Sequence, residues 1–154
     1  MNHMSFRVPG IFVASTLLVF FSGRILAQKP HFNHTTVYVT DLKRSSDFYV
    51  QVMQLEVIPE PFHDNKHVWF KIGDHSELHV VSGAATDVAH DINVHLAFAV
   101  PSLPDFMKHL DASHVKYGNW AGDPKKMQER PDHINQIYLQ DPDGYWIEVN
   151  NDHF

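Results

Sequence analysis

The sequence predicts an α+β fold built from two copies of one βαβββ unit. The order of apolar strand, helix and three further strands occurs twice, once in 28–90 and once in 91–154. Within each copy, apolar residues alternate with polar ones along the strands, and one longer segment carries apolar residues at helical spacing. A chain of 154 residues has room for one such domain with its own hydrophobic core.

Residues 1–27 are expected to form a secretory signal peptide that precedes this domain. Arg7 lies in a short basic start, an apolar run follows over 11–21, and small or polar residues lead to Ala27. The apolar run is short for a segment that must span a bilayer. We therefore expect cleavage after Ala27 or Gln28, and a mature protein that is exported to the periplasm or secreted.

The mature chain is expected to be acidic, and it has no cysteine. The signal segment contains two arginines and no acid, so its removal changes the net charge from −6 to about −8. An acidic surface disfavours nucleic acid as a partner and stable association with anionic membranes. The absence of cysteine excludes thiol nucleophiles, disulfides and cysteine-ligated metal sites.

The first unit is expected to begin with a strand over 34–40 and a helix over 42–55. Asp41 has the side chain and position of a helix N-cap, and the residues after it place an apolar stripe along one face of the helix. Turn-forming Pro, Asn, Asp and Gly residues then separate three short strands, which we expect at 56–60, 67–72 and 77–81.

The second unit is expected to follow the same plan. A strand is predicted over 93–100 and a helix over 103–112 with Ser102 as its N-cap. Three strands follow, at 114–118, 135–140 and 145–150. The connection 119–134 is long for a link between two strands. Its length is equally consistent with a surface insertion and with a lid over a pocket.

Alternation along the strands selects four residues for a shared site. In each unit the first and last strands have one apolar face, suited to packing under a helix, and an opposite face that carries one imidazole or carboxylate. These side chains belong to His34, His79, His95 and Glu148. If the two units pair around a pseudo-twofold axis, the four side chains come together. Three imidazoles and one carboxylate suit a divalent transition metal with positions left for water or substrate.

Further residues are predicted on the same faces as these four. They are four tyrosines or tryptophans and two polar residues: Tyr38, Trp69, Glu77, Gln136, Tyr138 and Trp146. Ordinary sheet packing accounts for such residues equally well. If they line a pocket, its aromatic content favours a small organic substrate with a carbonyl group or vicinal oxygens. The histidines of the domain other than His34, His79 and His95 are expected to lie in solvent, apart from His133 in the long loop, which is left open.

The sequence resembles the vicinal oxygen chelate superfamily over about 32–152. The resemblance is carried by the opening "NHTTVYVTDLKRSSDFYVQVMQL", the strands "ELHVV" and "HLAFAV", and above all "QIYLQDPDGYWIEV". It implies an eight-stranded, cup-shaped mixed sheet, mainly antiparallel, with helices on the convex face and a metal in the hollow. The family ligand positions correspond to His34, His79, His95 and Glu148. The implied cofactor is one divalent transition metal ion, Zn, Ni, Mn, Co or Fe.

The resemblance implies a metal-dependent glyoxalase-like lyase or isomerase that acts on a small carbonyl or vicinal-oxygen compound. In this branch the metal stabilises a developing oxyanion, and a carboxylate moves a proton next to a carbonyl. Glu148 is the candidate ligand and base, with Tyr138 beside it. The sequence departs from glyoxalase I in two ways. His79 stands where that enzyme has a second glutamate, and this chain is expected to be exported. In some relatives the hollow is completed within one chain, and in others across a homodimer.

Two alternatives remain open. In an Fe(II) extradiol-type dioxygenase, His34, His95 and Glu148 form a two-histidine, one-carboxylate triad. His79 then acts as an acid–base residue and Tyr138 corresponds to the family tyrosine. His133 precedes Tyr138 by five residues. In that family the second catalytic histidine precedes the tyrosine by more than this. The other alternative is a non-catalytic protein that binds a metal or a small molecule.

Overall fold

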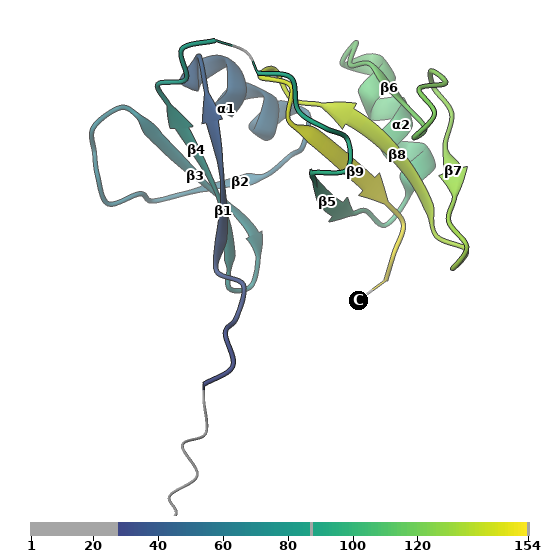
Figure 1. Ribbon diagram of the computed structural model, residues 1–154, viewed down its shortest axis with the longest axis horizontal. Coiled ribbons are helices and arrows are strands. Elements are labelled where there is room, and N and C mark those ends of the chain that lie inside the picture. The colour runs from purple at the N-terminus through teal and green to yellow at the C-terminus, as the bar shows by residue number, and fades with distance from the viewer. Residues whose placement is uncertain (1–27, 87, 154) are drawn as a thin grey trace, which may run out of the picture. The chain divides into compact units, whose positions relative to one another are not determined.

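The computed structural model describes residues 28–86 and 88–153. Within the compact unit His31–Phe154, two helices and nine strands are described (Figure 1). In chain order they are β1 (His34–Val39), α1 (Leu42–Gln51), β2 (Glu56–Ile58), β3 (His67–Gly73), β4 (Ser76–Ser82), β5 (His95–Ala99), α2 (Leu103–Ala112), β6 (Tyr117–Gly118), β7 (Gln128–Glu129), β8 (Asn135–Gln140) and β9 (Trp146–Asn150). The predicted signal peptide, 1–27, lies outside the described residues. Among those described, no helix is long and apolar enough to cross a membrane.

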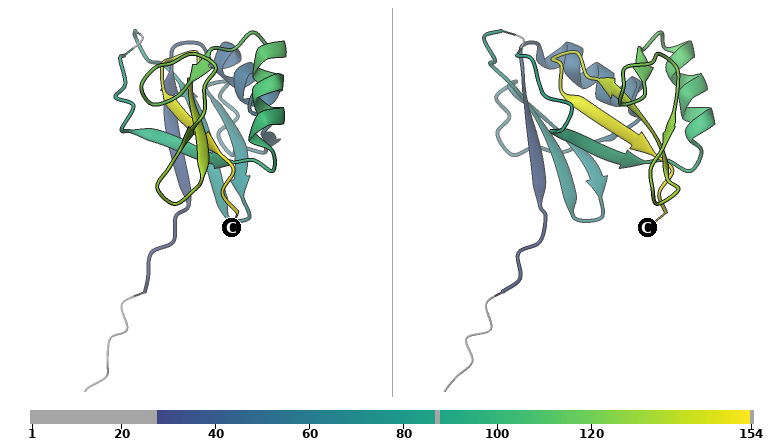
Figure 2. Two further views of the ribbon diagram at one scale, coloured as in Figure 1. Left: turned by 90° about the vertical axis from the view of Figure 1, so that its right-hand side faces the viewer. Right: turned by 45° about the vertical axis from the view of Figure 1, so that its right-hand side comes forward.

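Hydrogen bonds join the strands into two sheets. The first has the strand order β1-β4-β3-β2 and the second the order β5-β9-β8-β6, with β7 paired to β8. In each sheet the first and last strands of the unit run parallel, and the other pairs are antiparallel. Both helices lie on the same side of the strands (Figure 2). The predicted α+β fold of two βαβββ units is confirmed, and β7 is an additional short strand within the 119–134 connection.

The predicted apolar faces of the strands form the core. Six strand residues that alternation assigned to these faces are at most 1% exposed: Val37, Val39, Leu78, Val80, Ile147 and Val149. Tyr49 of α1 and Leu110 of α2 are 0% exposed in the same cluster. The period of two along a strand thus separates a core face from the face that carries the histidines.

The start of the second unit differs from the prediction, because β5 begins at His95 rather than at residue 93. A turn precedes the strand, in which Asn93 N donates to the Asp91 side chain at 2.8 Å and Val94 N donates to the Asp91 carbonyl at 2.9 Å. Val94, predicted on the apolar face, is therefore 74% exposed.

Both predicted helix caps are present. The Asp41 side chain accepts from Arg44 N at 3.0 Å, and the Ser102 side chain accepts from Asp105 N at 3.3 Å. Helix α1 ends at Gln51, four residues earlier than predicted. Gln54 follows with a positive φ of 56°, a left-handed conformation that cannot continue a right-handed helix.

A buried polar joint connects the turn before β9 to helix α1 of the other unit. Asp143 accepts from Thr40 N at 2.8 Å and from Ser45 Oγ at 2.5 Å, and Asp141 accepts from the Tyr49 hydroxyl at 2.8 Å. Both carboxylates are at most 5% exposed. The Asp-Pro-Asp-Gly turn is therefore a buried polar contact that links the second unit to the first.

Candidate functional site

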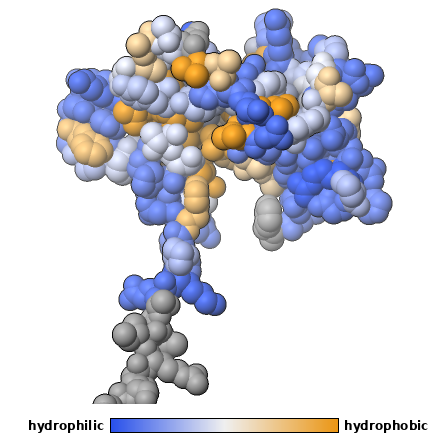
Figure 3. All heavy atoms as spheres, viewed as in Figure 1, coloured by the Kyte–Doolittle hydropathy of each residue, from blue (hydrophilic) through white to orange (hydrophobic). Residues whose placement is uncertain are grey.

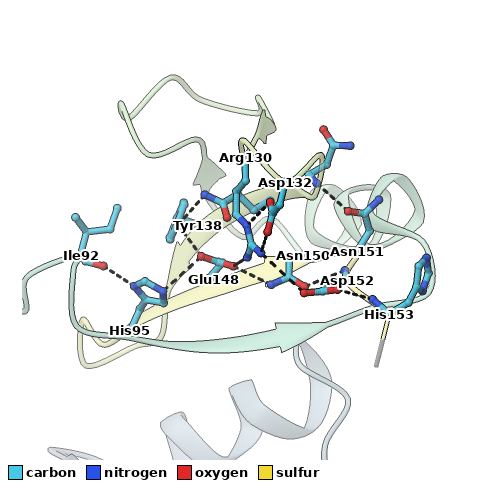
Figure 4. Close-up of polar contacts among 12 residues, drawn as sticks. Ile92, His95, Arg130, Asp132, Tyr138, Glu148, Asn150, Asn151, Asp152 and His153 are labelled. Carbon is cyan, nitrogen blue, oxygen red and sulfur yellow. Dashed lines mark hydrogen bonds and ion pairs between the residues drawn. The ribbon is translucent and has the colours of Figure 1, made fainter.

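Glu148 is a buried carboxylate on the open face of the second sheet. It lies in β9 between Ala97 of β5 and Tyr138 of β8, and its residue is 5% exposed. The Tyr138 hydroxyl donates to Oε2 at 2.7 Å, and Asn150 Nδ2 donates to Oε1 at 2.8 Å (Figure 4). A buried carboxylate needs such donors because desolvation penalises its charge.

His95 faces the same carboxylate from the neighbouring strand. Its Nδ1 lies 2.7 Å from the Ile92 carbonyl oxygen, and its Nε2 lies 3.4 Å from Glu148 Oε2. A carbonyl oxygen can only accept, so Nδ1 carries a hydrogen, and in the neutral form of the ring Nε2 would face Glu148 with its lone pair. A lone pair that faces a carboxylate is repelled unless a proton or a cation lies between them. Metal-binding histidines are typically held in this way, by a hydrogen bond from the other ring nitrogen.

Tyr138 is held as a hydrogen-bond donor within this group. Burial, and then the hydrogen bond to Glu148, raise the pKa of its hydroxyl far above the usual value. Gln136 Nε2 donates to the Tyr138 oxygen at 2.9 Å, whereas Gln136 Oε1 is buried without a hydrogen-bond partner among the described residues. Both residues were predicted on this face, and both lie there.

The long connection 119–134 packs onto this site. The Trp120 ring meets the Tyr138 ring edge-on at 5.6 Å, and Arg130 Nη1 lies 3.5 Å from Glu148 Oε1. Arg130 also forms two hydrogen bonds to Asp132, at 3.0 and 2.5 Å. The sequence did not identify Arg130 as a site residue, because the connection has no periodicity that indicates where its side chains point.

The two predicted ligand histidines of the first unit, His34 and His79, form a separate group on the first sheet. His79 lies between two parallel rings, with the His34 ring centroid at 4.3 Å and the Trp69 centroid at 3.9 Å. His79 Nε2 lies 2.9 Å from Glu77 Oε2, and His34 Nδ1 lies 2.7 Å from Asn33 Oδ1. Trp69 and Glu77 were both predicted on this face and are in contact with His79.

The structure thus brings the four predicted ligands together as two pairs. His34 stacks on His79 in the first sheet, and His95 faces Glu148 in the second. Across residues 28–86 and 88–153, no group of three or more His, Cys, Asp or Glu side chains is arranged to hold a metal ion. The physical reason is that β1 and β5, the strands that begin the two units, belong to separately hydrogen-bonded sheets.

The two pairs differ in how well they suit a metal. Two ligand atoms that each lie about 2.1 Å from one ion are roughly 3 to 3.5 Å apart. The His95–Glu148 separation of 3.4 Å fits this geometry. In the other pair the rings stack within 11° of parallel, so that pair must turn before both rings can bind one ion.

A cavity of about 810 Å³ adjoins the Glu148 group at the β6 edge of the second sheet. Tyr138 and Trp146 line it together with Lys116 and Lys125, and Tyr138 also contacts Glu148. The cavity is large enough for a small organic molecule.

Two histidines that were expected to be solvated make specific contacts instead. His109 Nε2 lies 3.0 Å from the Val52 carbonyl oxygen, which joins α2 to the end of α1. The His90 ring stacks on Tyr145 at 3.9 Å. Their positions in a helix and a loop gave no indication of these contacts, which form between segments distant in the sequence.

Comparison with known proteins identifies the family. A model of the Glyoxalase/Bleomycin resistance protein/Dioxygenase superfamily matches residues 31–149. A lactoylglutathione lyase of Pseudomonas putida is 24% identical over 150 residues, covering 77% of this chain and 83% of that protein.

Solved structures have the same fold. The oxidase ChaP-H1 superposes with a TM-score of 0.66 at 20% identity, covering 81% of this chain and 98% of its own. A lactoylglutathione lyase from Agrobacterium tumefaciens superposes with a TM-score of 0.59 at 19% identity, covering 80% and 95%. With a family model that spans nearly the whole described domain, the chain belongs to the Glyoxalase/Bleomycin resistance protein/Dioxygenase superfamily.

Proposed function

We propose that the protein is an exported, metal-dependent lyase or isomerase of the glyoxalase type. The observation that carries this proposal is the pairing of His95 and Glu148. The Ile92 carbonyl orients the ring so that Nε2 faces the carboxylate, at a separation suited to two ligands of one ion. The similarity to a lactoylglutathione lyase at 24% identity supports the reaction class.

His95 and Glu148 are proposed to supply one half of the metal site, and His34 and His79 the other half. Because these pairs are separate in one chain, we propose that a second copy of the chain completes the site in a homodimer. The ion, of the Zn, Ni, Mn, Co or Fe type, would supply positive charge to a substrate oxygen as negative charge develops there.

Glu148 is proposed to act on the substrate, with Tyr138 as the residue that orients it. Glu148 takes a proton from a carbon next to a carbonyl and returns it to the adjacent carbon, which is the proton transfer of an isomerase. Tyr138 donates to the same carboxylate and keeps it oriented. The substrate is a small carbonyl or vicinal-oxygen compound, and the cavity beside Tyr138 has room for the rest of it.

The experiment is elemental analysis of the purified protein, followed by assays with and without the metal found. Zinc or nickel with isomerisation of an α-hydroxycarbonyl compound would support the proposal. His34→Ala and Glu148→Gln should each lose activity, and a mixture of the two variants should recover part of it if a site uses both copies. Wild-type metal content in both variants, with full activity, would overturn the proposal.

The second candidate function is an Fe(II) dioxygenase, which one contact favours. His79 Nε2 is occupied by Glu77, so three ligands remain: His34, His95 and Glu148. Iron in the purified protein, with oxygen uptake on catechols, would select this candidate. Tight metal binding without any turnover would instead select a binding protein.

A further inference from the structure

Arg130 is a cation that lies among three carboxylates. Its guanidinium nitrogens lie 2.5 Å from Asp132, 3.5 Å from Glu148 and 3.9 Å from Asp152 (Figure 4). The hydrogen bonds from Arg130 lower the pKa of Asp132 to about 2, so Asp132 is charged at neutral pH. The single positive charge of Arg130 therefore interacts with three carboxylates.

The contacts of Arg130 are unequal. Two nitrogens bind Asp132 as a fork, with N–O distances of 3.0 and 2.5 Å, which is the strong bidentate arrangement. The 3.5 Å approach to Glu148 is an ion pair without a well-formed hydrogen bond. Arg130 can therefore move away from Glu148 and keep its main partner.

Arg130 and His95 approach different oxygens of Glu148. Arg130 Nη1 is next to Oε1, and His95 Nε2 is next to Oε2. A metal bound between His95 and Glu148 would therefore lie a few ångströms from the guanidinium. Glu148 is 5% exposed and the Arg130 side chain 30% exposed, so solvent screens the repulsion between two such cations only in part.

We propose that Arg130 is an internal cation that competes with the divalent metal for Glu148 and so sets the metal affinity of the site. This inference rests on the proposed function, because it requires that metal bind at Glu148. In the metal-free protein, Arg130 neutralises the buried carboxylate. On metal binding it gives up Glu148 and remains on Asp132.

The test is isothermal titration of the full chain with Zn²⁺ or Ni²⁺ alone. Arg130→Gln should lower the metal Kd about tenfold or more, because a repelling charge has been removed. Arg130→Lys keeps the charge and should stay near wild type. Lys126→Gln is the matched control, because it removes one charge from the same connection, where Lys126 is paired with Asp123 at 3.4 Å. It should leave Kd unchanged.

Thermal unfolding of the same variants gives a second readout. Arg130→Gln should lower Tm without metal, because three carboxylates lose their cation. Saturating metal should raise its Tm by more than it raises that of wild type, since tighter binding stabilises the folded state further.

Glu148→Gln separates the two proposals. If it abolishes metal binding while Arg130→Gln binds no more tightly than wild type, the role of Arg130 is wrong and the metal site stands. If wild type and Glu148→Gln bind metal equally, both proposals fail.

Discussion

Glu148 is a carboxylate among apolar strand neighbours, and its surroundings explain why the fold accepts it. Tyr138 and Asn150 donate to its two oxygens, while His95 and Arg130 approach them from opposite sides. A surface glutamate has no need of four partners. The partners stabilise the charged form of a side chain that is otherwise costly to bury.

Tyr138→Phe tests this arrangement. Loss of the hydroxyl leaves Glu148 Oε2 without its best donor and Gln136 Nε2 without an acceptor. We expect a loss of about 1 to 3 kcal/mol in the free energy of unfolding. A 10- to 100-fold loss in metal affinity or activity is expected as well, as is typical for residues that orient a ligand.

The matched control is Tyr117→Phe, a buried tyrosine whose hydroxyl makes only a 3.5 Å contact to Asp111. Denaturant unfolding and metal titration should separate the two variants clearly. Equal small effects from both substitutions would show that Tyr138 does not support Glu148.

At the scale of the elements, the helices α1 and α2 begin at caps of different quality. Asp41 accepts from Arg44 N at 3.0 Å with a charged oxygen, whereas Ser102 accepts from Asp105 N at 3.3 Å with a hydroxyl. A negative charge at a helix N-terminus also interacts favourably with the helix dipole.

Asp41→Ala should therefore destabilise the protein more than Ser102→Ala. We expect about 1 kcal/mol for Asp41→Ala and about half of that for Ser102→Ala, measured as free energies of unfolding in urea. The reverse order would mean that the second contact of Ser102, its 2.8 Å hydrogen bond to the Asp105 side chain, outweighs the charge of Asp41.

At the scale of the whole domain, stability depends on the joint between the Asp-Pro-Asp-Gly turn and α1. Burial alone would raise the pKa of Asp143, but hydrogen bonds from Ser45 and Thr40 and the charge of Arg44 outweigh it and lower the pKa. Burial raises the pKa of Asp141 on the same turn. The contributions of these two carboxylates to the free energy of unfolding therefore change with pH in opposite directions.

Asp143→Asn should cost about 2 to 4 kcal/mol at neutral pH, because it replaces a buried charge that accepts several hydrogen bonds. A group whose folded pKa is depressed stabilises the fold above its unfolded pKa, near 3.8, and loses this contribution as the pH falls through the folded value. The difference in the free energy of unfolding between wild type and variant should therefore become smaller in acid.

Urea unfolding of both proteins from pH 7 to about pH 2, which extends below the unfolded pKa of Asp143, measures this difference. Asp141 contributes the opposite trend in both proteins, since its raised pKa gives stability that is lost as the pH rises. The charge of Asp143 is itself one of the causes that raise the pKa of Asp141, so Asp143→Asn weakens this opposite trend and the narrowing of the gap in acid is partly offset. A gap that stayed constant with pH would show that the charge of Asp143 is not what holds the joint.

The sequence by itself determined the repeated βαβββ plan, the two helix caps and the division of each strand into a core face and a histidine-bearing face. These features are local: strand alternation has a period of two, and a cap is recognised within four residues. Val37 and His34 could therefore be assigned to opposite faces from their positions alone, and His95, Tyr138 and Glu148 could be placed on one face of a sheet.

Only the tertiary structure decided which of these side chains meet. The pairing of His34 with His79, separate from that of His95 with Glu148, depends on how strands distant in the sequence are joined into two sheets. The approach of Arg130 to Glu148 depends on the path of an aperiodic connection. Such contacts are fixed by long-range packing, which no local pattern of residues records.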